Sequence, residues 1–424
     1  MSDPTPSGRE PSLPFDPNRT GDEPSLGGDS YLDEIRAVLS SPDESRYGEM
    51  LDRLSEIKTP NGFVLLLEQL THPHPTVKAR SARLLGRDPR AVPALMQAIR
   101  IEDDRLQARF DAAARLEILQ SGDDERILGE AEEYNTPLND LLAALGRCAS
   151  GVNEALRESA SVFLASLLHR TLARYTADLR ALGVDSAEEL NLTDMDLIDP
   201  NFYKFVEALG WIRHPAAVPV LLEAVYRDVR VYAGHAWDAL KEIYEAYPDP
   251  AIRQQIVDGA FEALCAGDAW QYWGATRILQ AHGAAALPRL TSLMTDPDPL
   301  NRRGAVVALV RLLIAEEPIL TDPEDIQRTI VLLTAALNDP DNEVRLRIDW
   351  AFFEILKEVM IGKYYDVDQA LLQIPVHAMI RLISDQYGDD LGTVGHEVVS
   401  TLEHIVTEHT EQARRRSKVI PARS

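Results

Sequence analysis

A segment between residues 284 and 356 contains the same pattern twice. In each copy an apolar helical run is followed by an Asp-Pro-Asp turn and then by a second run that opens with arginines. The turns are Asp296-Pro297-Asp298, before Arg302 and Arg303, and Asp339-Pro340-Asp341, before Arg345. A unit that recurs in this way cannot bury its apolar face alone and must stack on a neighbour. The repeat therefore predicts an extended stack of helix pairs.

Shorter pieces of the same pattern recur upstream. They are a Leu-Gly step at Leu85-Gly86 and Leu209-Gly210, His-Pro turns at His72 and His214, and an Ala-Val-Pro run at residues 91–93 and 217–219. Proline is tolerated in the first turn of a helix, where its missing N–H would have no partner, and is disfavoured further along. We therefore expect each Ala-Val-Pro run to fix the start of a helix.

These residues resemble the HEAT repeat, in particular the bacterial subgroup of HEAT-like repeats first described in phycobilisome lyases. The similarity is good near residues 63–100, 205–245, 284–316 and 328–358. It implies an all-α superhelical solenoid of HEAT-like antiparallel helix pairs.

In that family an Asp of the turn and an Arg six positions later form a ladder of hydrogen bonds from repeat to repeat. The matching pairs in this chain are Asp296 with Arg302 and Asp339 with Arg345. His72 and Lys78 have the same spacing, but the acid is missing there. The resemblance thus implies a structural ladder that is interrupted in places.

The two ends of the chain differ in composition from the predicted repeats. Residues 1–29 are crowded with Pro, Gly, Ser and Asp, which predicts a disordered N-terminal tail. Residues 413–424 form a short basic C-terminal tail. We expect HEAT-like helix pairs over residues 30–120 and a C-terminal solenoid over residues 205–412.

Residues 121–204 depart most from the repeat pattern. Helix starts are expected near Asp124 and Pro137, and a long helix is expected from Val152 to Leu182. An acidic loop should follow that helix. The segment is either a divergent repeat or a functional insertion in the solenoid.

The charge and cysteine content limit the possible partners and compartment. The chain has 68 acidic and 43 basic residues, a formal net charge of −25. Such a field repels phosphate backbones and anionic lipids over roughly 8–10 Å, so neither nucleic acid nor membrane is an expected partner. Two lone cysteines and the absence of a signal pattern or long apolar run favour a cytoplasmic protein.

We find no motif that carries a recognisable chemistry. Phosphate-binding glycine loops, zinc-protease motifs and nucleophile elbows are all missing from the sequence. His396-Glu397, Glu403-His404 and Glu408-His409 resemble metal ligands, but one helix cannot supply a complete ligand set, and a solvated polar face explains them. We therefore predict no catalytic, cofactor-binding or metal-binding residues and no cofactor.

Clusters of large apolar residues are the best candidates for a binding surface. On a helical wheel, Leu346, Trp350, Phe353 and Met360 form one apolar stripe, opposite a second stripe that contains Val344 and Ile348. Trp270 and Trp273 form a similar cluster. Each cluster either packs between neighbouring helices or contacts a partner, and Trp is enriched in interface hot spots.

The sequence therefore favours a non-enzymatic helical-repeat scaffold or adaptor that binds a protein partner through the solenoid surface. The alternative is a bilin-lyase-like enzyme or a maturation factor for a cofactor-bearing protein, which only the resemblance suggests. The identity of the partner and the oligomeric state do not follow from the sequence.

Overall fold

The computed structural model describes residues 29–41, 43–57, 59–109, 124–182, 202–226, 230–266, 269–313, 315 and 319–348. Within these ranges the chain forms α-helices and short 3-10 helices and no strand, which confirms the predicted all-α class. The α-helices are α1 (Asp29–Leu39), α2 (Tyr47–Glu56), α3 (Pro60–Glu68), α4 (Pro75–Leu85), α5 (Val92–Arg109), α7 (Asp124–Ser150), α8 (Glu154–Leu182), α9 (Phe202–Ile212), α10 (Val218–Tyr226), α11 (Arg230–Ala246), α12 (Pro250–Cys265), α13 (Ala269–His282), α14 (Leu287–Leu293), α15 (Pro299–Leu313) and α16 (Pro323–Ala335). The 3-10 helices are η1 (Glu44–Arg46), η2 (Gln69–Thr71), η3 (Pro89–Ala91), η6 (Pro215–Ala217), η7 (Gly283–Ala286) and η8 (Ala336–Asn338).

Proline and capping side chains set where many helices begin. The Ala-Val-Pro runs place their valines, Val92 and Val218, at the first residue of α5 and α10, as predicted. At α12, the Asp249 carboxylate accepts a hydrogen bond from the Ala251 amide, 2.8 Å away, just before Pro250. These caps satisfy amide groups that a helix leaves without an internal partner.

Pro137 is the exception, because it lies inside α7. The prediction of a helix start at Pro137 is therefore wrong. Proline removes one backbone hydrogen bond and strains the preceding turn, but packing can hold the helix together across it. Here the part of α7 after Pro137 buries Leu138, Leu141 and Leu145 in the core.

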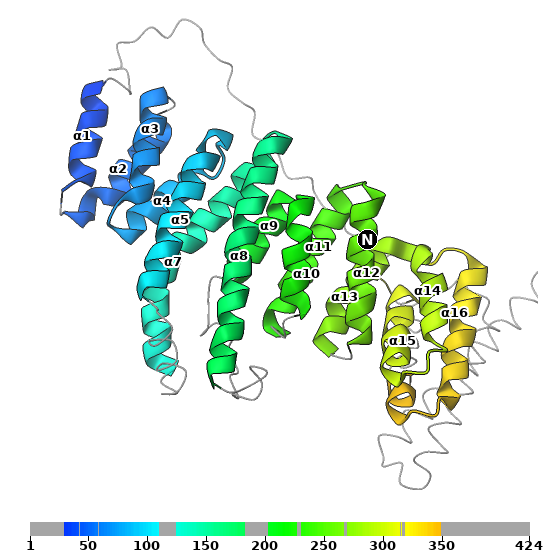
Figure 1. Ribbon diagram of the computed structural model, residues 1–424. Helices are drawn as coiled ribbons and strands as arrows, with labels where there is room; N and C mark the ends of the chain where they lie inside the picture. Colours follow the sequence, from blue (N-terminus) through cyan, green and yellow to red (C-terminus); the bar gives the residue numbers. More distant parts are fainter. Residues whose placement is uncertain are drawn as a thin grey trace, which may run out of the picture.

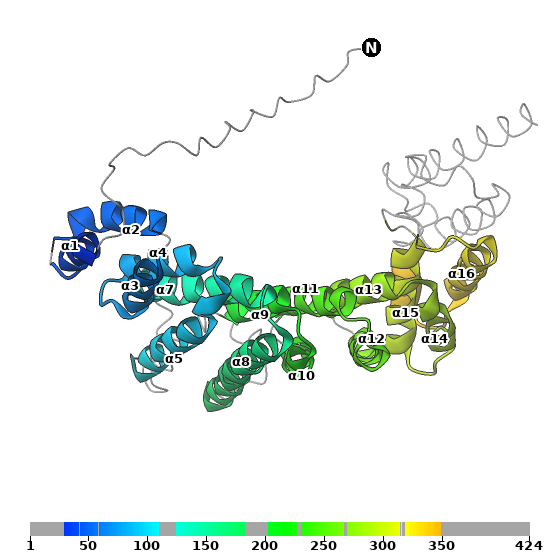
Figure 2. The same cartoon turned by 90° about the horizontal axis from the view of Figure 1, so that it is seen from above.

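The helices form two layers (Figures 1 and 2). The second-helix layer contains α4, α7, α9, α11, α13 and α15, whose neighbours pack in that order. The first-helix layer contains α3, α5, α8, α10, α12 and α14, which fan out on the other side in Figure 2. A layer that fans out lies on the convex side of a solenoid, so the second-helix layer lies on the concave side.

Glycines allow the second helices to approach one another closely. A Cβ added at Gly86 would lie 3.3 Å from the Cα of Ala144 in the next helix of the layer. At Gly210 the corresponding distance, to the Cα of Ala239, is 3.1 Å. The recurring Leu-Gly step therefore buries its leucine while its glycine lets the next helix pack against the backbone.

One hydrophobic core runs through the described chain, from Leu32 in α1 to Ile348. The divergent segment takes part in it, since α7 packs between α4 and α9, and α8 packs against α9. Both helices thus occupy the next places in the two layers. Among the described helices, none is long and apolar enough to cross a membrane.

Several predicted features lie outside the described residues. They are most of the N-terminal tail, the acidic loop before residue 200, residues Trp350, Phe353 and Met360, the His-Glu pairs after residue 395 and the basic C-terminal tail.

Candidate functional site

The predicted ladder residues meet in the turns between C-terminal repeats. Arg302, on α15, donates hydrogen bonds to both carboxylate oxygens of Asp339, at 2.7 and 2.8 Å. It also donates to the backbone oxygen of Asp296, at 2.8 Å. The guanidinium therefore holds the carbonyl of its own turn and the carboxylate of the next turn. The Asp296 side chain accepts instead from the Asp298 amide, 2.9 Å away.

Two further contacts extend this arrangement. Arg345 donates to the backbone oxygen of Asp339 at 2.5 Å, as Arg302 does to Asp296. Arg303 donates to both carboxylate oxygens of Asp341, at 3.0 and 3.1 Å. Burial acts to raise the pKa of Asp339, but hydrogen bonds from Arg302 and the Asp341 amide outweigh it, so this pKa lies below its ordinary value.

Histidines take the place of the turn aspartate in two other repeats. The Nδ1 atoms of His72 and His214 accept hydrogen bonds from the amides two residues later, at 3.0 and 3.2 Å. The Nε2 of His72 lies 2.7 Å from the backbone oxygen of Leu39, in the preceding repeat. An Nδ1 that accepts carries no proton, so these turns are built from neutral imidazole.

An exposed tryptophan marks the accessible surface of the second-helix layer. Trp273, on α13, is 58% exposed, and the guanidinium of Arg311 lies 4.2 Å from its ring centre. Its neighbour Tyr272 is buried. The side chain of Trp270 lies outside the described residues. Of the predicted stripe, Leu346 is described and is 38% exposed, whereas Val344 and Ile348 of the opposite stripe are buried.

A second cation–aromatic contact lies in the same layer at Trp211 on α9, whose side chain is half-buried. The guanidinium of Arg147, on α7, lies 5.6 Å from the Trp211 ring centre. Gly146 makes this possible, because a Cβ there would lie 2.8 Å from the ring. The sequence patterns did not single out Trp211. The pattern that could have identified it is the Leu-Gly step, since Trp211 follows Gly210 as Arg147 follows Gly146.

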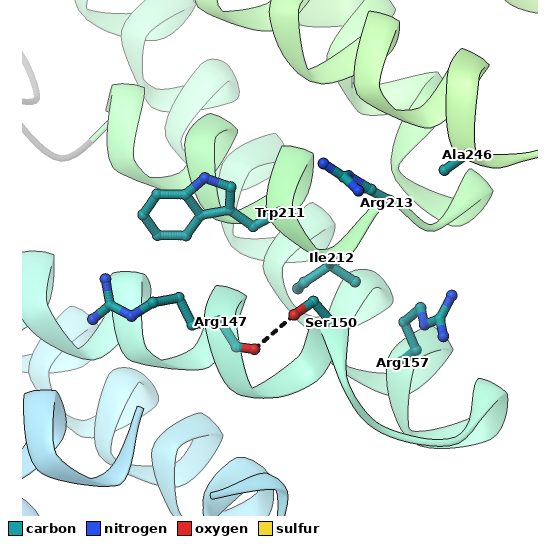
Figure 3. A pocket seen from close by; sticks show the side chains of 7 residues that line it. All are labelled: Arg147, Ser150, Arg157, Trp211, Ile212, Arg213 and Ala246. Carbon is teal, nitrogen blue, oxygen red and sulfur yellow. Dashed lines mark hydrogen bonds between the residues drawn. The ribbon is translucent and has the colours of Figure 1, made fainter. Parts of the chain in front are cut away.

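Trp211 lines an open pocket of about 530 Å³ (Figure 3). We call it the arginine pocket, because three of its lining residues are arginines and none is acidic. The lining residues come from the end of α7, the start of α8 and the ends of α9 and α11. The lining residues are Arg147, Ser150, Arg157, Trp211, Ile212, Arg213 and Ala246.

The three arginines of the pocket differ in their partners. Arg213 pairs with Glu242 at 2.5 Å, and Arg157 lies 3.6 Å from Glu154. Within the described residues Arg147 has no carboxylate within ion-pair distance, and the Nε atom of Arg157 is buried without a hydrogen-bond partner. Among the described residues, the pocket thus keeps unused hydrogen-bond donors and one unpaired positive charge.

The backbone at Arg213 is unusual. Its φ is 54°, a left-handed conformation that glycine normally adopts after a helix end. After α13 the corresponding residue is a glycine, Gly283, with a φ of 72°. A non-glycine residue in this region is destabilised by about 1 kcal/mol. Arg213 therefore occupies this position at a cost in stability that glycine would not have.

A hydrogen-bonded group of side chains lies beside the pocket. The Nε2 of His214 lies 3.2 Å from a carboxylate oxygen of Glu154, which also accepts from the Tyr247 hydroxyl. Burial lowers the pKa of His214 below its ordinary value, although the Glu154 charge opposes this. Burial and the hydrogen bond to Glu154 raise the pKa of Tyr247 to about 12. At neutral pH the group is thus a neutral histidine, a neutral tyrosine and a carboxylate.

Among the described residues, neither the thiol of Cys148 nor a cluster of metal ligands adds a reactive group beside the arginine pocket. Burial raises the pKa of the Cys148 thiol to about 11, and the thiol donates to the backbone oxygen of Leu85 at 3.0 Å. The thiolate, which is the nucleophilic form, is therefore scarce at neutral pH. In the part of the chain that the structure describes, no three His, Cys, Asp or Glu residues gather to hold a metal ion.

The fold and this surface define a helical-repeat protein, and comparison with known families agrees. Residues 203–226 match the family model described as PBS lyase HEAT-like repeat. They span α9, η6 and α10, so the match joins one second helix to the first helix of the following pair. The predicted resemblance is confirmed in this segment, and the chain carries a HEAT-like repeat. No curated protein matches the chain.

Solved structures with some similarity include two engineered proteins of the Northeast Structural Genomics Consortium. The first has 17% identity and a TM-score of 0.29, covering 89% of this chain and 98% of the other. The second has 17% identity and a TM-score of 0.24, covering 70% and 97%. Human deoxyhypusine hydroxylase in complex with glycerol has 16% identity and a TM-score of 0.24, covering 77% and 96%. At TM-scores this low, none of these similarities carries an argument about function.

Proposed function

We propose that the protein is a non-enzymatic scaffold that binds a protein partner through the concave, second-helix layer. The observation that carries this proposal is the exposure of Trp273 on α13, a helix of that layer, where the side chain is 58% accessible. Tryptophan and arginine are the side chains most enriched in interface hot spots. Here Trp273 is paired with Arg311, and Trp211 with Arg147.

Contacts between neighbouring helices hold the rest of the second-helix layer in a fixed shape. Neighbouring second helices are joined by ion pairs, including a bidentate pair from Arg83 of α4 to Asp140 of α7, at 2.7 and 2.8 Å. Arg277 of α13 pairs with Asp238 of α11. A surface held in one shape loses less conformational entropy when a partner binds. The stripe that begins at Leu346 stays a second predicted contact on the same protein.

Affinity capture from the native cell, followed by reconstitution with the purified captured protein, tests the proposal. We expect Trp273→Ala to weaken the reconstituted complex about 30-fold, the effect of losing a hot-spot contact of about 2 kcal/mol. The matched control is Val162→Ala, which removes an apolar side chain that is 51% exposed on α8 in the first-helix layer. If the two variants bind equally well, the concave layer is not the contact surface.

The alternative suggested by the family description, a bilin-lyase-like activity, is tested with the same protein preparation. The protein would be incubated with a bilin and an acceptor protein, and covalent attachment would be followed by absorbance. Attachment that depends on the chain would replace the scaffold proposal.

A further inference from the structure

The arginine pocket departs from the charge of the molecule around it. The chain as a whole has a formal net charge of −25. Most described arginines of the second-helix layer have a carboxylate partner, for example Arg80 with Asp52 and Arg303 with Asp341. Arg147 has none among the described residues, although it lies in a layer rich in acidic side chains. A local excess of positive charge on an acidic protein attracts an anionic group.

The local charge count limits how much negative charge the pocket can accept. Arg147, Arg157 and Arg213 contribute three positive charges, and Glu154 and Glu242, at ion-pair distance, contribute two negative charges. One positive charge is left. Glu158, exposed one turn further along α8, acts electrostatically on His214 beside the pocket and so adds negative potential there. The one remaining positive charge, at Arg147, matches one carboxylate, and the exposed Glu158 further opposes a doubly charged phosphate.

The pocket also offers apolar contacts beside its charges. The ring of Trp211 and the side chains of Ile212 and Ala246 line it together with the arginines. Its volume of about 530 Å³ lies within the ~300–1,000 Å³ of small-ligand pockets, which is more than an isolated ion needs. A ligand that fits both parts carries a carboxylate next to an apolar side chain.

We propose that the arginine pocket binds an acidic side chain of a partner peptide, with the carboxylate at Arg147 and the neighbouring apolar residue on Trp211. The left-handed backbone at Arg213 supports this, since it holds an arginine at the pocket where glycine would be less strained. This inference rests on the proposed scaffold function and names the chemistry of the partner segment. Guanidinium and carboxylate form charge-assisted hydrogen bonds, which are the strong ones in proteins.

The test uses the full chain labelled with 5-fluorotryptophan and fluorine NMR. The chain has five tryptophans, and the Trp211→Phe variant identifies the Trp211 signal by its loss. The probes are the blocked peptides acetyl-Gly-Glu-Leu-Gly-amide, its Gln counterpart and its phosphoserine counterpart. We expect the Glu peptide to shift the Trp211 signal saturably and to bind at least about tenfold more tightly than the Gln peptide.

Two variants isolate the charge from the fold. Arg147→Gln should reduce the affinity for the Glu peptide to that for the Gln peptide. Arg87→Gln is its matched control, because exposed Arg87 follows Gly86 at the end of α4 as Arg147 follows Gly146 on α7. Arg213→Gly should weaken binding several-fold while the melting temperature stays the same or rises, since glycine relieves the left-handed backbone.

Three results would overturn the inference: no shift of the Trp211 signal, equal affinities for the Glu and Gln peptides, or tighter binding of the phosphoserine peptide. The outcome is separable from that of the scaffold proposal. If partner binding depends on Trp273 but the peptides do not discriminate, only the pocket assignment fails. If the Glu peptide binds as expected but Trp273→Ala leaves the complex unchanged, the scaffold surface was misplaced and the pocket stands.

Discussion

The turns that join the repeats are built in two ways. In the C-terminal repeats, Asp339 accepts from the Asp341 amide and from the guanidinium of Arg302. In the repeat that begins at α10, His214 accepts from the Ala216 amide and its other ring nitrogen faces Glu154. Both side chains use one acceptor atom to close the turn and a second atom to reach another repeat.

The difference teaches that the same turn can be closed by deprotonated acceptors of different charge. Asp339 serves as an acceptor because it is ionised, and Arg302 supplies the compensating charge. His214 serves because it is neutral, and burial favours that state. One junction is thus held by a buried ion pair and the other by a neutral ring. The two junctions should therefore differ in how much stability they contribute and in the pH at which that contribution is lost.

Arg302→Ala should have the largest effect. The side chains of Arg302 and Asp339 are only 11% and 7% exposed, so the substitution leaves a buried carboxylate without its partner. Removing one member of a buried pair destabilises by about 3–5 kcal/mol. We expect urea unfolding, followed by far-UV circular dichroism, to show this loss, together with faster hydrogen exchange in α15.

The conservative control is Arg302→Lys, which keeps the charge but cannot donate to both carboxylate oxygens and to the Asp296 carbonyl at once. Its loss should be smaller than that of Arg302→Ala. Equal losses would mean that the geometry of the guanidinium, and not the compensation of charge, holds this junction.

The sequence predicted much of this architecture because its signals are local. Proline positions, Leu-Gly steps and helical periodicity each depend on a few adjacent residues, and they predicted the starts of α5 and α10 and the all-α class. The spacing of six also selected Arg302 and Asp339. The resemblance implied hydrogen bonds from repeat to repeat, but the spacing matched Arg302 with Asp296 and did not identify the Asp339 carboxylate as its acceptor, because a spacing within one turn carries no distance between turns.

The arginine pocket could not be found in the same way. Its residues come from α7, α8, α9 and α11, and Arg213 lies 66 positions from Arg147 along the sequence. Whether the Trp211 ring can lie against α7 depends on Gly146 in that helix. The sequence also did not show which aromatic residue of the cluster at positions 270–273 is accessible, since Tyr272 is buried and Trp273 is exposed.

Lowering the pH from 7.5 to 5.5 should affect the two kinds of junction differently, by less than Arg302→Ala does. The pKa of His214 lies below the ordinary 6.5, so its stabilisation is complete above about pH 6.5 and falls as the pH drops below it. The pKa of Asp339 lies below the ordinary 3.8, so its contribution is lost only in stronger acid. We expect the protection factor of the Ala216 amide to fall, while that of the Asp341 amide stays constant.

The control for this experiment is His214→Asn, whose side-chain oxygen can still accept from the Ala216 amide but does not titrate. Its Ala216 protection should be the same at both pH values, measured by hydrogen exchange with correction for the intrinsic rate. If the wild-type Ala216 amide is equally protected at both pH values, the neutral imidazole is not what closes this turn.

The smallest effect is expected from an arginine whose ion pair also joins two repeats but lies on the surface. Arg289, on α14, pairs with Asp258 of α12 at 2.6 Å, and the two side chains are 46% and 47% exposed. Water solvates both charges after either is removed, so exposed pairs contribute about 0–1 kcal/mol. The contact of the guanidinium with the Phe261 ring, 4.1 Å from its centre, adds a term of about 0.5–1 kcal/mol. Arg289→Ala should therefore cost no more than about 2 kcal/mol in urea unfolding and should lose part of that cost in high salt. A loss equal to that of Arg302→Ala would show that burial does not distinguish the two contacts, and that repeat-to-repeat contact alone sets their strength.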